Sequence, residues 1–192
     1  MTLQKFTHIN FLKSRVFGLV FLYLIIFTAS CRQEPSNELD RVKQEAVTEY
    51  KEKMEEQRQQ KLNTLEKFYS VFETGDISVL PEVITEDYTQ YPSDPGQTPD
   101  IPGFIKHAQD FGKMFSDLTG DETHILIDGD LAHVRRINEA THSGNVFGIE
   151  ATGRRVTIIS FDTHHFTKDG KIDKTWHLED FWGAYSQIKT NE

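Results

Sequence analysis

The chain has 192 residues, with 21 Lys and Arg against 30 Asp and Glu, and its formal net charge at pH 7 is −9. This length suits one domain of ordinary size together with shorter additional segments. An acidic surface without a basic stripe repels a phosphate backbone, so the composition argues against a nucleic-acid-binding protein.

The first thirty residues are typical of a secretory signal peptide. The charged residues before Cys31 are Lys5, Lys13 and Arg15, and the apolar run VFGLVFLYLIIF follows at positions 16–27. A basic start, a short apolar segment and small residues before a cleavage site define such a leader. An uncleaved anchor helix is the alternative, but a membrane span needs about 20 apolar residues.

Cys31 is the only cysteine of the chain, so it cannot form an internal disulfide bond. Residues 28–31 read Thr-Ala-Ser-Cys and resemble a bacterial lipobox, in which the cysteine becomes the lipidated N-terminus. The resemblance implies that residues 1–30 are removed and that Cys31 carries the lipid. Several acyl chains would hold the protein on a membrane. We therefore expect an exported protein that is lipid-anchored to the bacterial cell envelope, on the periplasmic or surface side of the outer membrane.

Residues 31–61 are expected to form a charged helical spacer. The stretch from Asn37 to Lys61 has no Gly or Pro and is dense in Glu, Lys, Gln and Arg, which favour helices. Opposite charges recur at helical spacing, as at Glu49 and Lys53. A coiled-coil segment is the alternative, but apolar positions do not persist over the roughly three or four heptads that it needs.

Residues 62–190 are expected to form one α+β domain, because helical patterns come first and strand patterns follow. Leu62, Leu65, Tyr69 and Phe72 form an apolar helical stripe that ends at Gly75. A short helix (77–83), a strand (85–91), a loop (92–102) and a helix (101–118) come next. Turn residues then separate strand-like segments at 124–127, 131–143, 154–166 and 172–180.

Several local sequences within residues 62–188 resemble the SnoaL-like polyketide cyclases, also grouped as ester cyclases. They are Phe72-Glu73-Thr74-Gly75-Asp76, Ile84-Thr85-Glu86-Asp87-Tyr88, Ala140-Thr141-His142-Ser143-Gly144, residues 148–156 (GIEATGRRV) and Asp169-Gly170-Lys171-Ile172 with Trp176 and Asp180. The resemblance implies the cone of the nuclear transport factor 2-like fold, in which three helices pack on a strongly bent, mainly antiparallel sheet. It says less about function, because this fold carries enzymes, binding proteins and scaffolds.

Asp180 is the first candidate catalytic residue. Alternate residues of a strand share a face, so Ile172, Trp176, Leu178 and Asp180 are expected to line the cavity. A carboxyl group beside apolar side chains has a raised pKa that suits proton transfer. The resemblance implies the same role, because the family's acid/base aspartate lies four residues after the tryptophan. A surface carboxylate or a cap at the strand end is the alternative.

His164 is the second candidate catalytic residue. Pairing across the turn at 167–171 puts the even-numbered residues of 154–166 on the face of Trp176 and Asp180. His164, with Asp162, then points inward and His165 points outward. A register slip of one residue would reverse this assignment.

The candidate substrate-binding residues come from three strands. Arg136, Asn138 and His142 lie on the expected inward face of the 131–143 strand, and Trp176 lines the cavity wall. Tyr88 and Tyr91 complete the set. Many relatives read Tyr-x-x-His where this chain reads Tyr88-Thr89-Gln90-Tyr91. A tyrosine can donate a hydrogen bond to an enolate oxygen but cannot replace an imidazole at neutral pH.

The resulting expectation is a cofactor-free acid/base enzyme that cyclises or isomerises a small apolar or carbonyl-containing compound. A non-catalytic, membrane-tethered binding protein of the same fold is the alternative. No metal is expected, because strand parity separates His164, His165, His177, Asp162 and Glu179 between two faces and no paired metal-ligand motif occurs. A homodimer formed through the open sheet face is left open.

Overall fold

The structure is a computed structural model, and it describes residues 38–93 and 96–189. The expected leader and the lipidation site at Cys31 lie outside these residues. The chain divides into two compact units, residues 1–52 and 53–192. In the first unit the structure describes residues 38–52, which are helical and exposed apart from the half-buried Asp40. No helix within the described ranges is long and apolar enough to cross a membrane.

Helix α2 (Glu38–Thr74) joins the two helical patterns of the sequence without a break. The segment contains no Gly or Pro that would interrupt the helix. Its buried side chains all lie in the last three turns and include Leu65, Phe68 and Tyr69. Gly75 ends the helix with a φ of +72°, and its N–H donates to the carbonyl of Val71 at 2.9 Å. A left-handed glycine is a common helix terminator because it lacks a Cβ atom.

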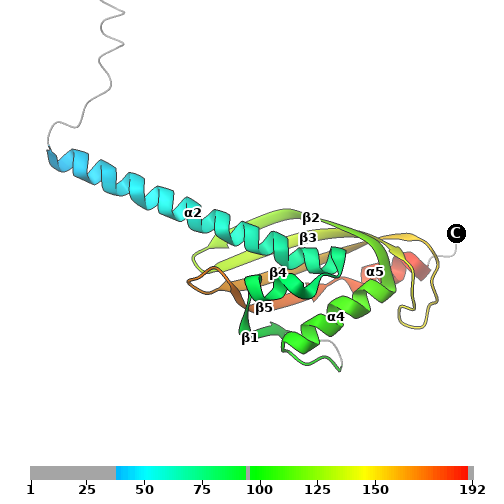
Figure 1. Cartoon of the computed structure of the whole chain (residues 1–192). Coiled ribbons are helices and arrows are strands. Elements are labelled where there is room, and N and C mark those ends of the chain that lie inside the picture. The colour runs from blue at the N-terminus through cyan, green and yellow to red at the C-terminus, as the bar shows by residue number, and fades with distance from the viewer. Residues whose placement is uncertain (1–37, 94–95, 190–192) are drawn as a thin grey trace, which may run out of the picture. The chain divides into compact units, whose positions relative to one another are not determined.

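The second unit has the expected α+β architecture (Figure 1). Its sheet has the order β1-β5-β4-β3-β2, with β1 parallel to β5 and the other pairs antiparallel. The strands are β1 (Ile84–Tyr91), β2 (Phe115–Asp128), β3 (Leu131–His142), β4 (Arg155–Phe166) and β5 (Ile172–Glu179). The other helices are η1 (Ile77–Val79), α3 (Leu80–Val83), α4 (Ile101–Met114) and α5 (Phe181–Lys189).

The boundary between α4 and β2 differs from the sequence-based prediction. The helix ends at Met114, not near residue 118, and β2 starts at Phe115, not near residue 124. Phe115 and Ser116 pair with His142 and Thr141 of β3. Pairing with a neighbouring strand therefore outweighs the local helical pattern, as tertiary contacts often do.

A β-bulge near the start of β5 reverses the expected orientation of that strand. Phe166 pairs with Ile172, but His165 pairs with Lys174, so Asp173 is an extra residue without a partner across the strand. One extra residue moves every later side chain to the opposite face. The expected inward position of Trp176 is wrong, since this side chain is 44% exposed.

Two helices cover the concave face of the sheet. In Figure 1 the C-terminal part of α2 and helix α4 lie across the strands. Their apolar side chains form the core with the inward residues of the sheet, and this core includes Phe68, Phe104, Val134 and Phe166. The opposite face of the sheet stays open and exposes apolar side chains at Leu126, Phe161, Trp176 and Leu178.

Candidate active site

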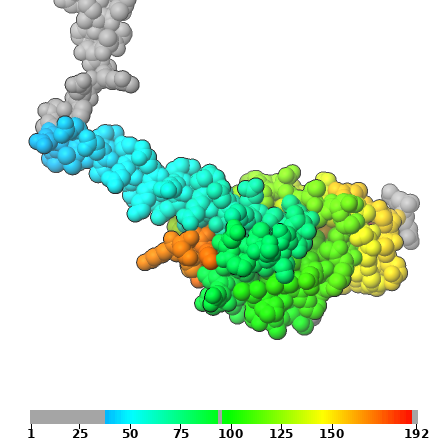
Figure 2. Space-filling view, in the orientation of Figure 1, coloured from blue at the N-terminus to red at the C-terminus, as the bar shows by residue number. Residues whose placement is uncertain are grey.

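A narrow cavity lies inside the cone, between α2, α4 and the sheet. Its volume of about 20 Å³ has room for about one water molecule. In Figure 2 the bright green side chains, which include those of α4, cover part of the visible face of the domain. The lining combines four apolar side chains with eight that can form hydrogen bonds: Phe68, Phe72, Phe111, Leu118, Tyr69, Gln90, Arg136, Asn138, Ser160, Asp162, His177 and Glu179.

His177 and Asp162 form the central polar pair of the cavity. They lie opposite each other on β5 and β4, and the Nδ1 atom of His177 donates to Oδ1 of Asp162 at 2.6 Å. The hydroxyl of Tyr69 donates to the other carboxylate oxygen of Asp162 at 2.9 Å. Asp162 is 5% exposed, so these two donors stabilise a carboxylate that water barely reaches.

The pKa values of this pair favour the charged forms. Burial alone would lower the pKa of His177, but the carboxylates of Asp162 and Glu179 outweigh burial and raise it to about 10. Burial alone would raise the pKa of Asp162, but the hydrogen bond from His177 and the charge on that ring keep it below its ordinary value. The imidazole of His177 therefore carries a proton on both ring nitrogens at neutral pH and acts as a hydrogen-bond donor.

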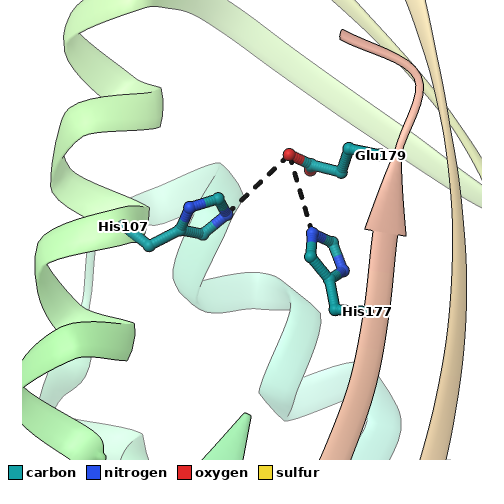
Figure 3. Close-up of side chains that lie close together, drawn as sticks. All are labelled: His107, His177 and Glu179. Atoms are coloured by element: carbon teal, nitrogen blue, oxygen red, sulfur yellow. Dashed lines mark ion pairs between the residues drawn. The ribbon is translucent and has the colours of Figure 1, made fainter. Parts of the chain in front are cut away.

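Glu179 and His107 complete the polar group on the far side of His177 (Figure 3). One carboxylate oxygen of Glu179, Oε2, lies 3.6 Å from Nε2 of His177 and 3.8 Å from Nε2 of His107. The side chains of Glu179 and His107 are 6% and 5% exposed. Among the described residues, Oε2 of Glu179 and Nε2 of His177 have no hydrogen-bond partner. Two imidazoles and a carboxylate thus converge in a site that water hardly reaches.

Sequence reasoning missed this arrangement. His107 lies on the buried stripe of α4 with Phe104 and Phe111, and a polar residue within an apolar stripe is the signal in the sequence that could have indicated it. His177 and Glu179 were expected on the outer face. The bulge at Asp173 turns both inward, and it removes the parity argument against a metal site.

Arg136 lines the cavity, as expected, but its charge is already paired with two carboxylates of the protein. Its guanidinium pairs with Glu73 and with Glu122, the latter at 3.1 Å, and donates to the carbonyl of Gly120 at 3.2 Å. It also lies over the ring of Tyr69, 4.6 Å from the ring centre. A buried charge needs such partners, so Arg136 is well suited to hold the cavity wall together. Asn138 is also inward, at 5% exposure.

His164 points inward, as expected, but it lies behind Tyr69 and does not line the cavity. It is fully buried. Its Nε2 bonds to the Tyr69 hydroxyl at 2.9 Å, and its Nδ1 bonds to the Thr175 hydroxyl at 2.9 Å. Burial lowers the pKa of His164 to about 4. A neutral, fully bonded ring of this kind supports the orientation of Tyr69 and, through it, that of Asp162.

Asp180 is not in the cavity, so the expected inward position is wrong. It follows the last residue of β5 and is exposed. One of its carboxylate oxygens accepts the N–H of Gly183 at 2.7 Å, at the start of α5. This is the geometry of a helix N-cap. The side chain of Asp180 therefore caps the N-terminus of α5 and does not face a ligand in the cone.

The remaining sequence-predicted binding residues are dispersed. His142 is fully buried and bonds to Thr152 at 2.9 Å, away from the cavity lining. Tyr88 is 1% exposed and donates to Gln90 at 3.1 Å, and burial raises its pKa. Tyr91 is 44% exposed. Of the predicted binding residues, Arg136 and Asn138 line the cavity.

The fold and its enclosed polar cavity place the chain in the class of nuclear transport factor 2-like cone proteins. The model of the SnoaL-like polyketide cyclase family matches residues 63–188. The chain therefore belongs to the SnoaL-like polyketide cyclase family, as the sequence resemblance predicted. No curated protein sequence matches it.

Solved structures share this fold. TsrD from Streptomyces laurentii superimposes with a TM-score of 0.62 at 22% identity, over 69% of this chain and 96% of that chain. IdmH from Streptomyces antibioticus superimposes with a TM-score of 0.60 at 26% identity, over 68% of this chain and 99% of that chain. A protein from Bacillus cereus superimposes with a TM-score of 0.59 at 25% identity, over 67% of this chain and 80% of that chain. The last two are provisionally described as polyketide cyclases.

Proposed function

We propose that this protein is an acid/base enzyme of the cyclase or isomerase type, acting on a small carbonyl compound. The observation that carries the proposal is the position of His177, whose ring lies between the carboxylates of Asp162 and Glu179 in the cavity. Membership in the SnoaL-like family and the provisional descriptions of IdmH and the Bacillus cereus protein support it. Asp180 has no part in this proposal, because it lies outside the cavity.

The geometry suits removal of a proton next to a carbonyl group. Glu179 takes the proton as the carbon–hydrogen bond breaks, and the electron pair moves onto the carbonyl oxygen. The N–H at Nε2 of His177 donates to that oxygen and stabilises the enolate. In a cyclisation, the enolate carbon forms a bond to a second carbonyl carbon of the same molecule, and the new alkoxide receives the proton that Glu179 took, which restores the carboxylate. In an isomerisation, the proton returns to another carbon.

The size of the cavity restricts the substrate. A space for about one water molecule admits a ligand only when apolar side chains such as Phe72 and Leu118 move aside. Both are only partly buried, so they are the side chains with room to move. We therefore expect a compact substrate that enters past these two residues.

Hydrogen–deuterium exchange tests the proton-transfer step directly. The full chain is incubated in D₂O with small 1,3-diketones and β-keto esters, and loss of the α-proton signal is followed by NMR. We expect exchange above the buffer rate in the wild type and a loss of about 100-fold or more in Glu179→Gln, the usual scale for a removed acid/base group. His165→Asn, on the outer side of β4, is the control.

Two results would contradict the proposed enzymatic function. Exchange at the buffer rate for every compound would contradict it, and so would equal rates in the wild type and Glu179→Gln. A compound that raises the melting temperature without any exchange would favour the binding protein of the same fold.

We also propose that the chain is carried to the cell envelope as a lipoprotein. The support is the sequence of residues 1–31, in which a basic start and an apolar run lead to Thr-Ala-Ser-Cys. An exported enzyme would meet substrates that arrive from outside the cell or from the envelope itself.

A further inference from the structure

Three potential metal ligands from two elements converge inside the cone. His107 comes from α4, and His177 and Glu179 come from β5. Their ligand atoms all lie within 4.8 Å of one another. Figure 3 shows both imidazole rings directed towards the same carboxylate oxygen of Glu179.

The spacing of these atoms is close to that of a coordination site. Bonds of about 2.1 Å from zinc to nitrogen and oxygen put neighbouring tetrahedral ligands about 3.4 Å apart. The two distances from Oε2 of Glu179 are 3.6 Å and 3.8 Å, so these two pairs need to close by only a few tenths of an ångström. The ligand atoms of the two histidines lie within 4.8 Å of each other, so a small rotation of the rings completes the site. We propose that His107, His177 and Glu179 bind one divalent transition-metal ion of the zinc type.

The ligand types favour this class of ion over magnesium or calcium. Imidazole nitrogen suits zinc, copper, iron and nickel, whereas magnesium and calcium require mainly oxygen ligands. Two histidines with one carboxylate also leave a position for water or substrate, as in catalytic zinc sites. The cavity next to His177 and Glu179 has room for about one water molecule at that position.

The surroundings of His177 orient it for coordination. Its Nδ1–H donates to Asp162 at 2.6 Å, and Asp162 accepts the Tyr69 hydroxyl at 2.9 Å. A carboxylate bound to one ring nitrogen fixes the tautomer and directs the lone pair of the other nitrogen to the metal. This carboxylate–histidine arrangement is the usual support of a metal ligand.

The charge balance of the site also favours a cation. Asp162 and Glu179 are two carboxylates that face His177 in a nearly dry environment. The nearby Arg136 is already paired with Glu73 and Glu122. Buried charges need compensation, and a divalent ion bound to neutral histidines would balance both carboxylates.

The site overlaps with the one in the proposed function, and its catalytic consequence rests on that function. The bound ion would replace the proton of His177 as the positive charge next to a carbonyl oxygen. Metal binding itself is measured without substrate. Failure of the metal proposal would therefore leave the exchange result standing, and the reverse also holds.

The first measurement is a titration of the full chain with Zn²⁺. The chain is purified without a histidine tag, treated with a chelator, and titrated in competition with a chromophoric chelator. We expect one Zn²⁺ per chain with micromolar or tighter affinity, a higher melting temperature with Zn²⁺, and no competition by millimolar Mg²⁺. Co²⁺ should bind the same site and give a visible absorption spectrum that Zn²⁺ abolishes.

Substitutions then locate the ion. His107→Asn and Glu179→Gln should each weaken Zn²⁺ binding at least 100-fold, and Asp162→Asn should weaken it about 10-fold, as loss of a supporting carboxylate does. His165→Asn is the matched control, because His165 makes an equally short bond to Asp173 and, within the part of the chain that the structure describes, does not belong to a group of three potential ligands. Absence of stoichiometric binding in the wild type would overturn the proposal, whatever the variants do. Unchanged affinity in either His107→Asn or Glu179→Gln would also overturn it.

Discussion

The Nδ1 atom of His177 lies 2.6 Å from Oδ1 of Asp162, across the pair of strands β4 and β5. The same distance separates Nδ1 of His165 from Oδ1 of Asp173, near the bulge of β5. The two pairs differ in burial. The side chains of His177 and Asp162 are 15% and 3% exposed, whereas those of His165 and Asp173 are 42% and 32% exposed. The sheet thus contains a buried histidine–aspartate pair and a matched, half-buried one.

This contrast predicts different energetic costs for the same substitution. Asp162→Asn leaves a buried imidazolium without its carboxylate, so the free energy of unfolding should fall by about 3 kcal/mol. Asp173→Asn should cost less than about 1 kcal/mol, because water reaches and screens the half-buried pair of His165 and Asp173. Urea unfolding at pH 7 measures both values. Equal losses in the two variants would show that burial does not govern the His177–Asp162 pair.

His164 predicts a loss of stability in mild acid. Its pKa is lowered to about 4 in the folded chain, against about 6.5 in an unfolded one. Between these values the unfolded chain binds more protons, so stability falls as the pH drops from about 6.5 to about 4 and this contribution is then fully lost. The loss amounts to about 3 kcal/mol. Urea unfolding at several pH values should show a smaller slope in His164→Gln than in the wild type, and NMR titration of His164 near 6.5 would contradict the prediction.

A side chain added at Gly120 is expected to disturb the packing next to Arg136. A Cβ atom at this position would lie 2.5 Å from the guanidinium of Arg136 and 2.5 Å from Oδ1 of Asn138. Arg136 is held by two carboxylates and has little freedom to move, so Gly120→Ala should destabilise the domain by about 1–3 kcal/mol. Gly112→Ala is the control. It lies in α4 with nothing within 4 Å of the new atom, and it should stabilise by about 0.5–1 kcal/mol. Thermal unfolding that ranks the two variants in the opposite order would refute this account.

Asp180 predicts a helix-cap effect. Asp180→Ala removes the acceptor of the Gly183 N–H and should lower the free energy of unfolding by about 1 kcal/mol. Calorimetry or urea unfolding measures this change. A large loss of α-proton exchange in a folded Asp180→Ala variant would instead show that Asp180 takes part in the reaction.

The expected lipidation of Cys31 predicts that the protein is bound to a membrane. If the cysteine carries the lipid, the wild type should be recovered in the membrane fraction and should incorporate labelled palmitate, because acyl chains bind a bilayer strongly. Cys31→Ser should incorporate no label, as its hydroxyl cannot replace the thiol in lipidation. Equal labelling of both proteins, or no label in the wild type, would be inconsistent with a lipoprotein.

Much of the fold could be read from the sequence because it depends on uninterrupted local patterns. The even-numbered residues of β3 and β4 alternate without a break from Ala132 to His142 and from Val156 to Phe166, and all of them are buried. A regular strand preserves such parity along its whole length. The inward positions of Arg136, Asn138, Asp162 and His164 follow from this rule.

Only the tertiary structure decided which groups meet in the cavity. The extra residue at Asp173 arises from strand pairing, and it exchanges Trp176 and Asp180 for His177 and Glu179 on the inner face. His107 reaches them from α4, about 70 residues earlier in the chain, because helix and sheet pack against each other. Periodicity determines the face that a segment presents. Pairing register and packing, which depend on contacts distant in sequence, determine the site.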